Sequence, residues 1–213
     1  MNIQVGEDPK FYGIHEGVLR KCSPQFGSIL TSTTDTETPN LTYKPATTLL
    51  TLPNDDSNTY IRFQRYLYSD SLLLDNEDFS SLPWTTLLDV YLFGIKFSIV
   101  TLQNKCIDTA INKNKADNKL PNADGLTKLW RTEAKAKPMR SLLLELYARK
   151  CDLKAAMAAP GGRWPMPFMK ALVGEMYTVG KEKEEGKEER VRWWGRRREW
   201  YVSDQANPFA VDD

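Results

Sequence analysis

The sequence has a single histidine, His15, and three widely separated cysteines, Cys22, Cys106 and Cys151. With one histidine and no Cys-x-x-Cys pair, it lacks the clustered ligands of a zinc site. An odd number of scattered cysteines favours free thiols in a reducing compartment over a disulfide framework. We therefore expect no metal, no cofactor and an intracellular location, cytoplasmic or nuclear.

The sequence also lacks an excess of one charge and a long apolar run. The 29 Lys and Arg residues nearly balance the 28 Asp and Glu residues, for a net charge of +1. Total charge thus gives no reason to expect nucleic acid or an anionic membrane as partner. There is no apolar run of about 18 residues, and residues 1–10 show no basic start followed by an apolar block. We expect neither a membrane span nor a signal peptide.

Catalytic motifs are missing as well. A histidine base needs a nucleophile or an orienting acid within reach, but the adjacent Glu16 would point in another direction on a helix. Gly161-Gly162 is followed by Arg163-Trp164 instead of the Lys-Ser/Thr of a phosphate loop. The acidic residues at 55–56 and 75–78 lack EF-hand spacing and suit turns and helix caps. We therefore predict that the protein is not an enzyme.

The first half of the chain contains short strand and helix patterns typical of an α+β fold. Residues 3–5 and 10–14 predict a hairpin, and residues 47–52 predict a third strand. Ser23-Pro24 predicts a helix start, because serine caps helices and proline suits the first helical position. Periodic apolar residues predict helices over 15–21, 24–30, 59–68 and 84–97. The polar stretch 31–40 predicts a flexible loop, and 72–74 a short edge strand.

The helix over 84–97 is apolar on nearly every side, which is typical of a buried central helix. Further helices are predicted over 102–111, from residue 138 onward and over 168–178, with a polar linker at 112–122 and a break at 160–167. We accordingly divide the chain into a domain over 1–113, a helical extension over 114–180, and a charged, flexible tail over 181–213.

The tail contains a basic aromatic stretch, VRWWGRRREWY, at residues 191–201. Arginines interleaved with aromatic rings can bind single-stranded nucleic acid or anionic lipid, so Arg196, Arg197 and Arg198 are candidate polyanion contacts. The alternative is that one or two tryptophans pack against the domain. The first interpretation predicts a nucleic-acid- or chromatin-associated regulator.

Several short matches, taken in order over residues 3–113, resemble the BTB/POZ domain, most closely its fungal branch. They are the hairpin leading into FYGIH, the strand end LTLP, the helix FQRYLYS, and the run LDVYLFGIKF followed by LQN. The residues that carry the resemblance are His15, Leu19, Ser23, Phe26, Leu52, Pro53, Phe63, Tyr68, Tyr91, Lys96, Phe97 and Leu102.

The resemblance implies a helix cluster flanked by a small three-stranded sheet, here followed by the helical extension. It also implies a non-catalytic module that associates with itself or with other proteins, some members being adaptors of cullin ubiquitin ligases. The family binds the ligase scaffold along the helix at 60–68 and the loop at 69–78. Tyr60, Gln64 and Asp70 are therefore the candidate partner surface. For His15 we predict a structural role, with its imidazole hydrogen-bonded at a strand-to-helix junction.

Overall fold

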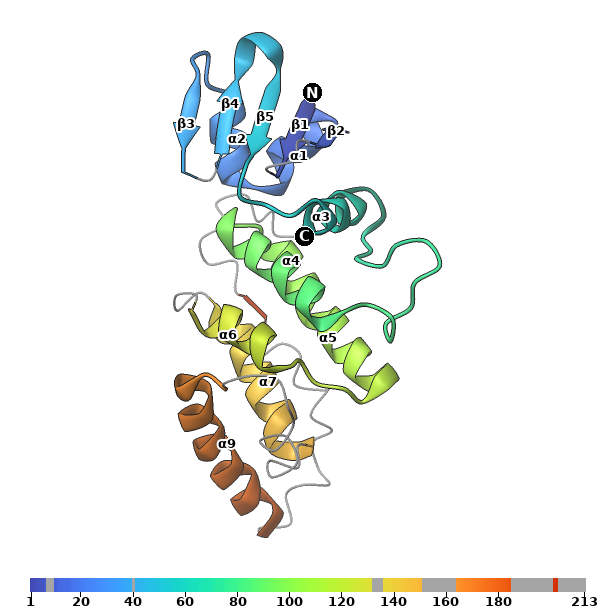
Figure 1. Cartoon of the computed structure of the whole chain (residues 1–213), viewed down its shortest axis with the longest axis vertical. Coiled ribbons are helices and arrows are strands. Elements are labelled where there is room, and N and C mark those ends of the chain that lie inside the picture. The colour runs from blue at the N-terminus through green and yellow to red at the C-terminus, as the bar shows by residue number, and fades with distance from the viewer. Residues whose placement is uncertain (7–9, 40, 132–135, 151–163, 185–200, 203–213) are drawn as a thin grey trace, which may run out of the picture. The chain divides into compact units, whose positions relative to one another are not determined.

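The computed structural model describes residues 1–6, 10–39, 41–131, 136–150, 164–184 and 201–202, and these form an α+β protein. The contacts divide the chain into two compact units. Unit 1 comprises Met1–Glu77 and Asp89–Leu102, and unit 2 comprises Asp78–Leu88 and Gln103–Asp213. The boundaries of these units differ from those of the predicted segments, which end at residues 113 and 180. Figure 1 shows the strands and first helices of unit 1 in blue.

Unit 1 contains a mixed sheet of five strands in the order β2-β1-β5-β4-β3. The strands are β1 (Asn2–Val5), β2 (Lys10–Gly13), β3 (Thr36–Thr38), β4 (Leu41–Lys44) and β5 (Leu49–Leu52). Strand β1 is antiparallel to β2 and parallel to β5, while β4 is antiparallel to both β5 and β3. The predicted hairpin and third strand are thus confirmed.

The expectation of three strands is wrong, because residues 36–44 add the hairpin β3–β4. The stretch at 31–40, predicted to be a loop, contains β3. Its side chains are exposed or half-buried, so an edge strand here needs no apolar residue. Threonine is favoured in strands, and Thr36 and Thr38 lie opposite Tyr43 and Leu41 of β4.

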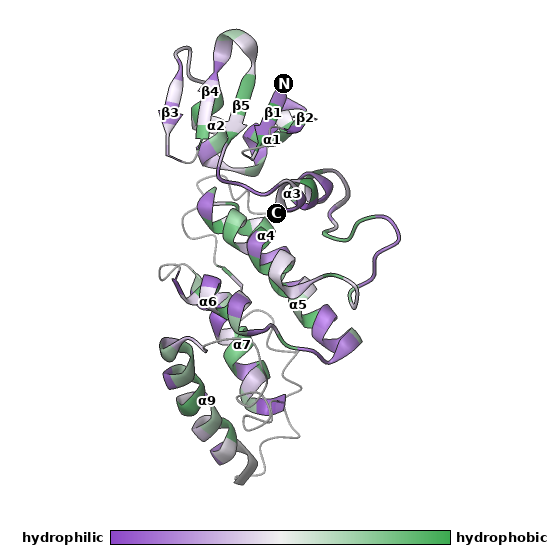
Figure 2. Ribbon diagram, viewed as in Figure 1, coloured by the Kyte–Doolittle hydropathy of each residue, from purple (hydrophilic) through white to green (hydrophobic). Residues whose placement is uncertain are grey.

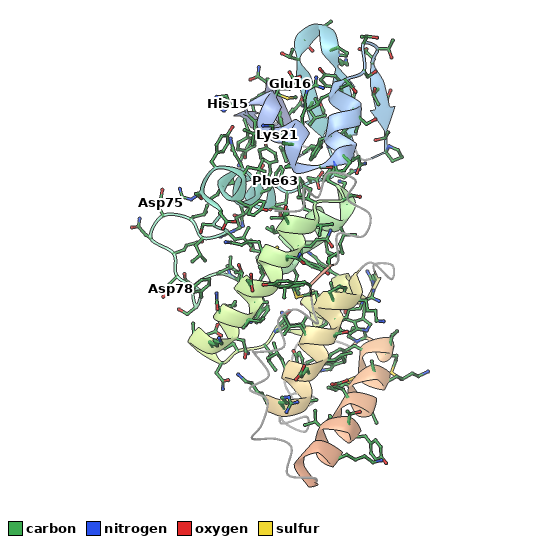
Figure 3. The ribbon with its side chains drawn as sticks, turned by 180° about the vertical axis from the view of Figure 1, so that it is seen from behind. His15, Glu16, Lys21, Phe63, Asp75 and Asp78 are labelled. Atoms are coloured by element: carbon green, nitrogen blue, oxygen red, sulfur yellow. The ribbon has the colours of Figure 1, made fainter. Side chains whose placement is uncertain are left out.

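One face of the sheet is apolar. Its alternating buried residues are Ile3, Val5, Leu41, Tyr43, Leu50 and Leu52. Helices α1 (Glu16–Cys22) and α2 (Pro24–Leu30) lie along one side of the sheet (Figures 1 and 3). The predicted start of α2 is confirmed: the Ser23 hydroxyl accepts hydrogen bonds from the amides of Gln25 (3.1 Å) and Phe26 (3.4 Å). The same hydroxyl donates to the carbonyl of Phe97 (2.6 Å).

The centre of unit 1 is a group of packed phenylalanine rings, which we call the Phe cluster: Phe26, Phe63, Phe93 and Phe97. Phe26 and Phe97 have ring centroids 4.7 Å apart, Phe63 and Phe93 4.9 Å, and Phe93 and Phe97 4.6 Å. The rings come from α2, α3 (Ser57–Ser69), α4 (Trp84–Lys96) and the residue that follows α4. All four are at most 2% exposed, so aromatic packing holds these helices together.

Unit 2 is helical, with α5 (Val100–Asp117, from Gln103 on), α6 (Ala123–Arg131), α7 (Lys137–Lys150) and α9 (Met166–Glu184). Helix α5 runs through part of the stretch predicted as a linker, so that prediction is wrong for 112–117. Its last turns are hydrophilic (Figure 2) yet include the buried Lys113 and Asn114. Lys113 donates to the carbonyls of Phe79 (3.3 Å) and Ser80 (3.1 Å) and to Asp117 (2.8 Å). These partners allow a charged residue to be buried.

Helices α6, α7 and α9 meet around Phe168. Its ring lies 4.9 Å from Trp130, 5.2 Å from Tyr147 and 5.6 Å from Trp164. Helix α9 begins at Met166, inside the predicted break at 160–167, of which residues 160–163 lie outside the described ranges. Among the described residues, no helix is long and apolar enough to cross a membrane.

Candidate protein-interaction surface

His15 lies at the junction between β2 and α1, as predicted, and is hydrogen-bonded there. Its backbone amide donates to the Tyr68 hydroxyl (3.0 Å), and its Nδ1 lies 2.8 Å from the same oxygen. The tyrosine proton can therefore be donated to Nδ1 of a neutral ring that carries its own proton on Nε2. His15 is the residue preceding α1, but its side chain forms no capping bond. Both residues are exposed, so the bond lies at the surface; Figure 3 shows the position of His15.

Gln64 attaches the same edge of the sheet to α3. Its side-chain amide donates to the carbonyl of Gly13 on the edge strand β2 (2.8 Å). Tyr68 lies one helical turn further along α3 and is 50% exposed. The contacts of Gln64 and Tyr68 thus help to join α3 to the segment from β2 to α1.

Tyr60 does not belong to this surface, contrary to the prediction. Its side chain is 0% exposed, and its ring lies 4.9 Å from that of Tyr12 and 5.9 Å from that of Phe63. Burial raises the pKa of its hydroxyl. Four residues advance a helix by one turn plus about 40°, so Tyr60, Gln64 and Tyr68 turn progressively from the core toward solvent.

Asp70 is exposed and ends α3. Its backbone is left-handed (φ 50°), and its amide donates to the carbonyl of Tyr66 (2.9 Å). Asparagine and aspartate tolerate this conformation better than most residues. Asp70 therefore lies at a turn that directs the following loop away from the helix.

The loop after Asp70 is held to α3 by an ion pair. Arg62, 3% exposed, donates to both carboxylate oxygens of Glu77 (2.7 Å each) and to the carbonyl of Leu72 (2.8 Å). Glu77 also accepts from the amide of Leu74 (2.9 Å). The hydrogen bonds from Arg62 lower the pKa of Glu77, and the bond from Leu74 and the Arg62 charge act in the same direction. Residues 72–74 bind these side chains and form no strand, so the predicted edge strand is wrong.

Phe11 is the most exposed aromatic residue near this edge, at 65%. It lies on the outer face of the sheet in a row that crosses all five strands. In register, the row contains Phe11, Gln4, Thr51, Thr42 and Glu37. The row is otherwise polar, so Phe11 is its one large apolar side chain. We call Phe11, His15, Gln64, Tyr68 and Asp70 the β2–α3 surface.

Most of the other residues that carry the family resemblance are structural. The buried ones are Leu19, Ser23, Phe26, Leu52, Phe63, Tyr91, Phe97 and Leu102. Pro53 is half-buried directly after β5. Lys96 forms an ion pair with Asp55 (2.7 Å). Burial raises the pKa of Asp55, and the bond to Lys96 opposes that effect.

The two cysteines that the structure describes, Cys22 and Cys106, show no activation. Burial raises the pKa of Cys22 to about 12, and its thiol donates to the carbonyl of Leu19 (3.1 Å). Cys106 is buried in α5, and burial raises its pKa too. Cysteine reacts as the thiolate, so neither thiol is primed as a nucleophile. Cys151 lies outside the described residues.

The structure describes only part of the stretch predicted to be a flexible tail. Arg196, Arg197 and Arg198 lie outside the described residues. Tyr201 and Val202 are described, and they bind Asn104 and Asp108 of α5. Sequence reasoning missed this contact because it joins residues more than 90 positions apart, and no periodic pattern reports such a pairing.

Neither a protein-family model nor a curated protein sequence matches this chain.

Proposed function

We propose that this chain is a non-catalytic protein-interaction module that binds a protein partner through the β2–α3 surface. The observation that carries the proposal is the exposure of two aromatic side chains: Phe11 on the outer face of edge strand β2, and Tyr68 on α3, bonded to His15 just after β2. Aromatic residues are enriched at protein interfaces, where they supply buried area at little entropic cost. Polar groups border both rings, as in an interface with an apolar centre and a polar rim.

The contacts around Tyr68 favour a surface formed before binding. His15 fixes the tyrosine hydroxyl, and Gln64 fixes the end of β2. The Arg62–Glu77 pair holds the loop that follows. Ordered side chains lose less entropy when a partner binds. A surface built in this way suits recognition of a folded partner.

The resemblance to BTB/POZ domains supplies two partners to test. One is a second copy of this chain, and the other is a cullin, for which the chain would serve as a ubiquitin-ligase adaptor. Both proposals rest on the resemblance and on the exposed aromatics, and the same surface variants test both.

Light scattering after size-exclusion chromatography measures self-association, and titration against a purified cullin N-terminal domain measures adaptor binding. We expect one of the two in the unaltered chain. The double variant Phe11→Ala, Tyr68→Ala should weaken it by tenfold or more, since interface aromatics contribute about 2 kcal/mol or more each.

The matched control is the double variant Val173→Ala, Tyr177→Ala, which removes two equally exposed side chains from α9 in unit 2 (62% and 66%). It should leave association unchanged. A chain that is monomeric at high concentration and does not bind the cullin contradicts the proposal. Equal effects of the two double variants contradict its placement on the β2–α3 surface.

A further inference from the structure

A short segment of the chain, Tyr201-Val202, docks on helix α5 through hydrogen bonds to Asn104 and Asp108. The Tyr201 hydroxyl lies 2.8 and 2.9 Å from the two carboxylate oxygens of Asp108. Asn104 binds the main chain of Val202 on both sides: its side-chain oxygen accepts from the Val202 amide (2.8 Å), and its side-chain nitrogen donates to the Val202 carbonyl (3.3 Å).

Helix α5 presents these two groups on its outward side. Asn104 and Asp108 are four residues apart and thus neighbours on one face, and both are half-buried. Cys106, Ile107 and Ala110 are fully buried on the rest of the helix. Tyr201-Val202 therefore binds to polar side chains of α5 that are not part of the buried core of unit 2.

The chemistry of the contact specifies what can bind. An asparagine that pairs with both the N–H and the C=O of one residue recognises main chain, and proline, which has no N–H, cannot bind in this way. A carboxylate accepts hydrogen bonds only, so the preceding side chain must carry a donor. Tyrosine has that donor and phenylalanine does not.

We propose that Asn104 and Asp108 form a docking site for a tyrosine-containing segment, and that a segment of another protein can replace Tyr201-Val202 there. The proposal concerns unit 2 and goes beyond the function proposed for the β2–α3 surface. Phosphorylated tyrosine does not fit this site. The phosphate has a charge of about −1.5 to −2, and it would face the Asp108 carboxylate in place of the hydroxyl donor.

The chain's own segment competes with any partner. A segment tethered to its site acts at an effective concentration on the order of millimolar. A partner segment of similar intrinsic affinity therefore binds measurably at micromolar concentration only when the Tyr201-Val202 contact is weakened. The test therefore needs a chain in which the Tyr201-Val202 contact has been removed.

The probe is a fluorescent seven-residue peptide, EWYVSDQ, with the sequence of residues 199–205. It is titrated by anisotropy against the full chain carrying Tyr201→Ala and Val202→Pro, which vacate the site. We expect binding at least about tenfold tighter than to the unaltered chain. The peptide with phenylalanine for tyrosine should bind about tenfold more weakly, because a hydrogen bond to a charged group is lost. The phosphotyrosine peptide should not bind.

Asp108→Asn, added to the vacated chain, should weaken binding of the tyrosine peptide, while Asp124→Asn on α6 serves as the matched control and should not. Equal binding of the three peptides, or none to the vacated chain up to about 1 mM, overturns the proposal. A second measurement does not depend on the vacated chain folding: Tyr201→Phe alone should speed hydrogen exchange of the Val202 amide severalfold. An unchanged exchange rate also overturns the proposal.

Discussion

The two units bury different chemistry at their centres. Unit 1 is centred on the Phe cluster. Unit 2 has its own aromatic group around Phe168, but it also buries Lys113 and Asn114 in α5. Polar residues can be buried in a core when each has a hydrogen-bond partner. A polar stretch such as residues 112–117 is therefore not necessarily a linker.

Amide and ammonium groups also join the end of α5 to the end of α7 in unit 2. Lys150, at the end of α7, donates to the side-chain oxygens of Asn114 and Asn118 (2.9 Å to the latter). Asn114 donates in turn to the carbonyl of Lys119 (3.0 Å). Partial burial lowers the pKa of Lys150. These contacts are directional, as is the Arg62–Glu77 pair of unit 1, so each unit combines packed apolar side chains with polar contacts that depend on geometry.

The tryptophans allow the two units to be followed separately. All six lie in the residues of unit 2, and unit 1 contains none. Tryptophan fluorescence therefore reports on unit 2, and far-ultraviolet circular dichroism reports on both. Denaturation followed by both signals is the measurement for the variants below.

The largest loss of stability is expected from Phe97→Ala in the Phe cluster. Removing this ring leaves a cavity against Phe26 and Phe93, at a cost of about 3–5 kcal/mol. The control is Phe11→Ala on the outer face of the sheet, which should change stability by less than about 0.5 kcal/mol. Similar losses in the two variants would mean that unit 1 does not depend on the cluster.

Lys113→Met tests the polar centre of unit 2. The change keeps side-chain length but removes the Lys113 donor from the carbonyls of Phe79 and Ser80 and from one carboxylate oxygen of Asp117, at a cost of about 2–3 kcal/mol. Tryptophan fluorescence should report the loss. Lys170→Met, at an exposed position on α9, is the control and should be nearly neutral. A neutral or stabilising Lys113→Met would show that apolar packing alone supports unit 2.

Glu77→Gln tests whether an ion pair adds to the apolar centre of unit 1. We expect a loss of about 1–2 kcal/mol at pH 7. Because Arg62 lowers the pKa of Glu77 in the folded state, its stabilisation is present above the ordinary value of 4.5 and is lost as pH falls through the lower, folded-state pKa. The difference between unaltered chain and variant should therefore shrink below about pH 4.5.

Asp75→Asn is the control for this pair. Asp75 binds Arg65 (2.7 Å), but its side chain is 80% exposed. Exposed pairs contribute about 0–1 kcal/mol, so this variant should change little. A pH-independent difference for Glu77→Gln would contradict the assigned role of the carboxylate.

The smallest effect is expected at His15. Since its bond to Tyr68 is at the surface, His15→Ala should cost about 0.5–1 kcal/mol. Tyr68→Phe removes the same bond from the other side, together with the bond that the hydroxyl accepts from the His15 amide. In a double-mutant cycle the two losses should be less than additive, by about 0.5 kcal/mol. Full additivity would show that the contact contributes nothing to stability.

The sequence predicted the elements that depend on adjacent residues better than those that depend on distant partners. Ser23-Pro24 defined the start of α2 correctly, since capping depends on adjacent residues. The apolar spacing likewise located α3 and α4. The strand β3 and the end of α5 were missed because their stability comes from partners distant in sequence. Tyr60 was misplaced because its exposure depends on the angle of α3 relative to Tyr12.

The candidate surface was predicted only in part. Gln64 and Asp70 lie where expected, but the exposure of Phe11 depends on β2 being an edge strand with one open face. The helices of unit 1 determine which face of β2 is exposed to solvent. The alternation of residues along the strand does not predict which face that is. The Tyr201 contact had no local pattern at all.

The pairing of β1 with β5 has a consequence for the order of folding. Ile3 lies opposite Leu50 in a parallel arrangement, and α1, α2, β3 and β4 all lie between them in the chain. Strand β1 can form its hairpin with β2 early, but it gains its second neighbour only after that long loop closes. Non-local parallel pairing is slow. Completion of the sheet should therefore be the late step in refolding, with α1 and α2 already formed.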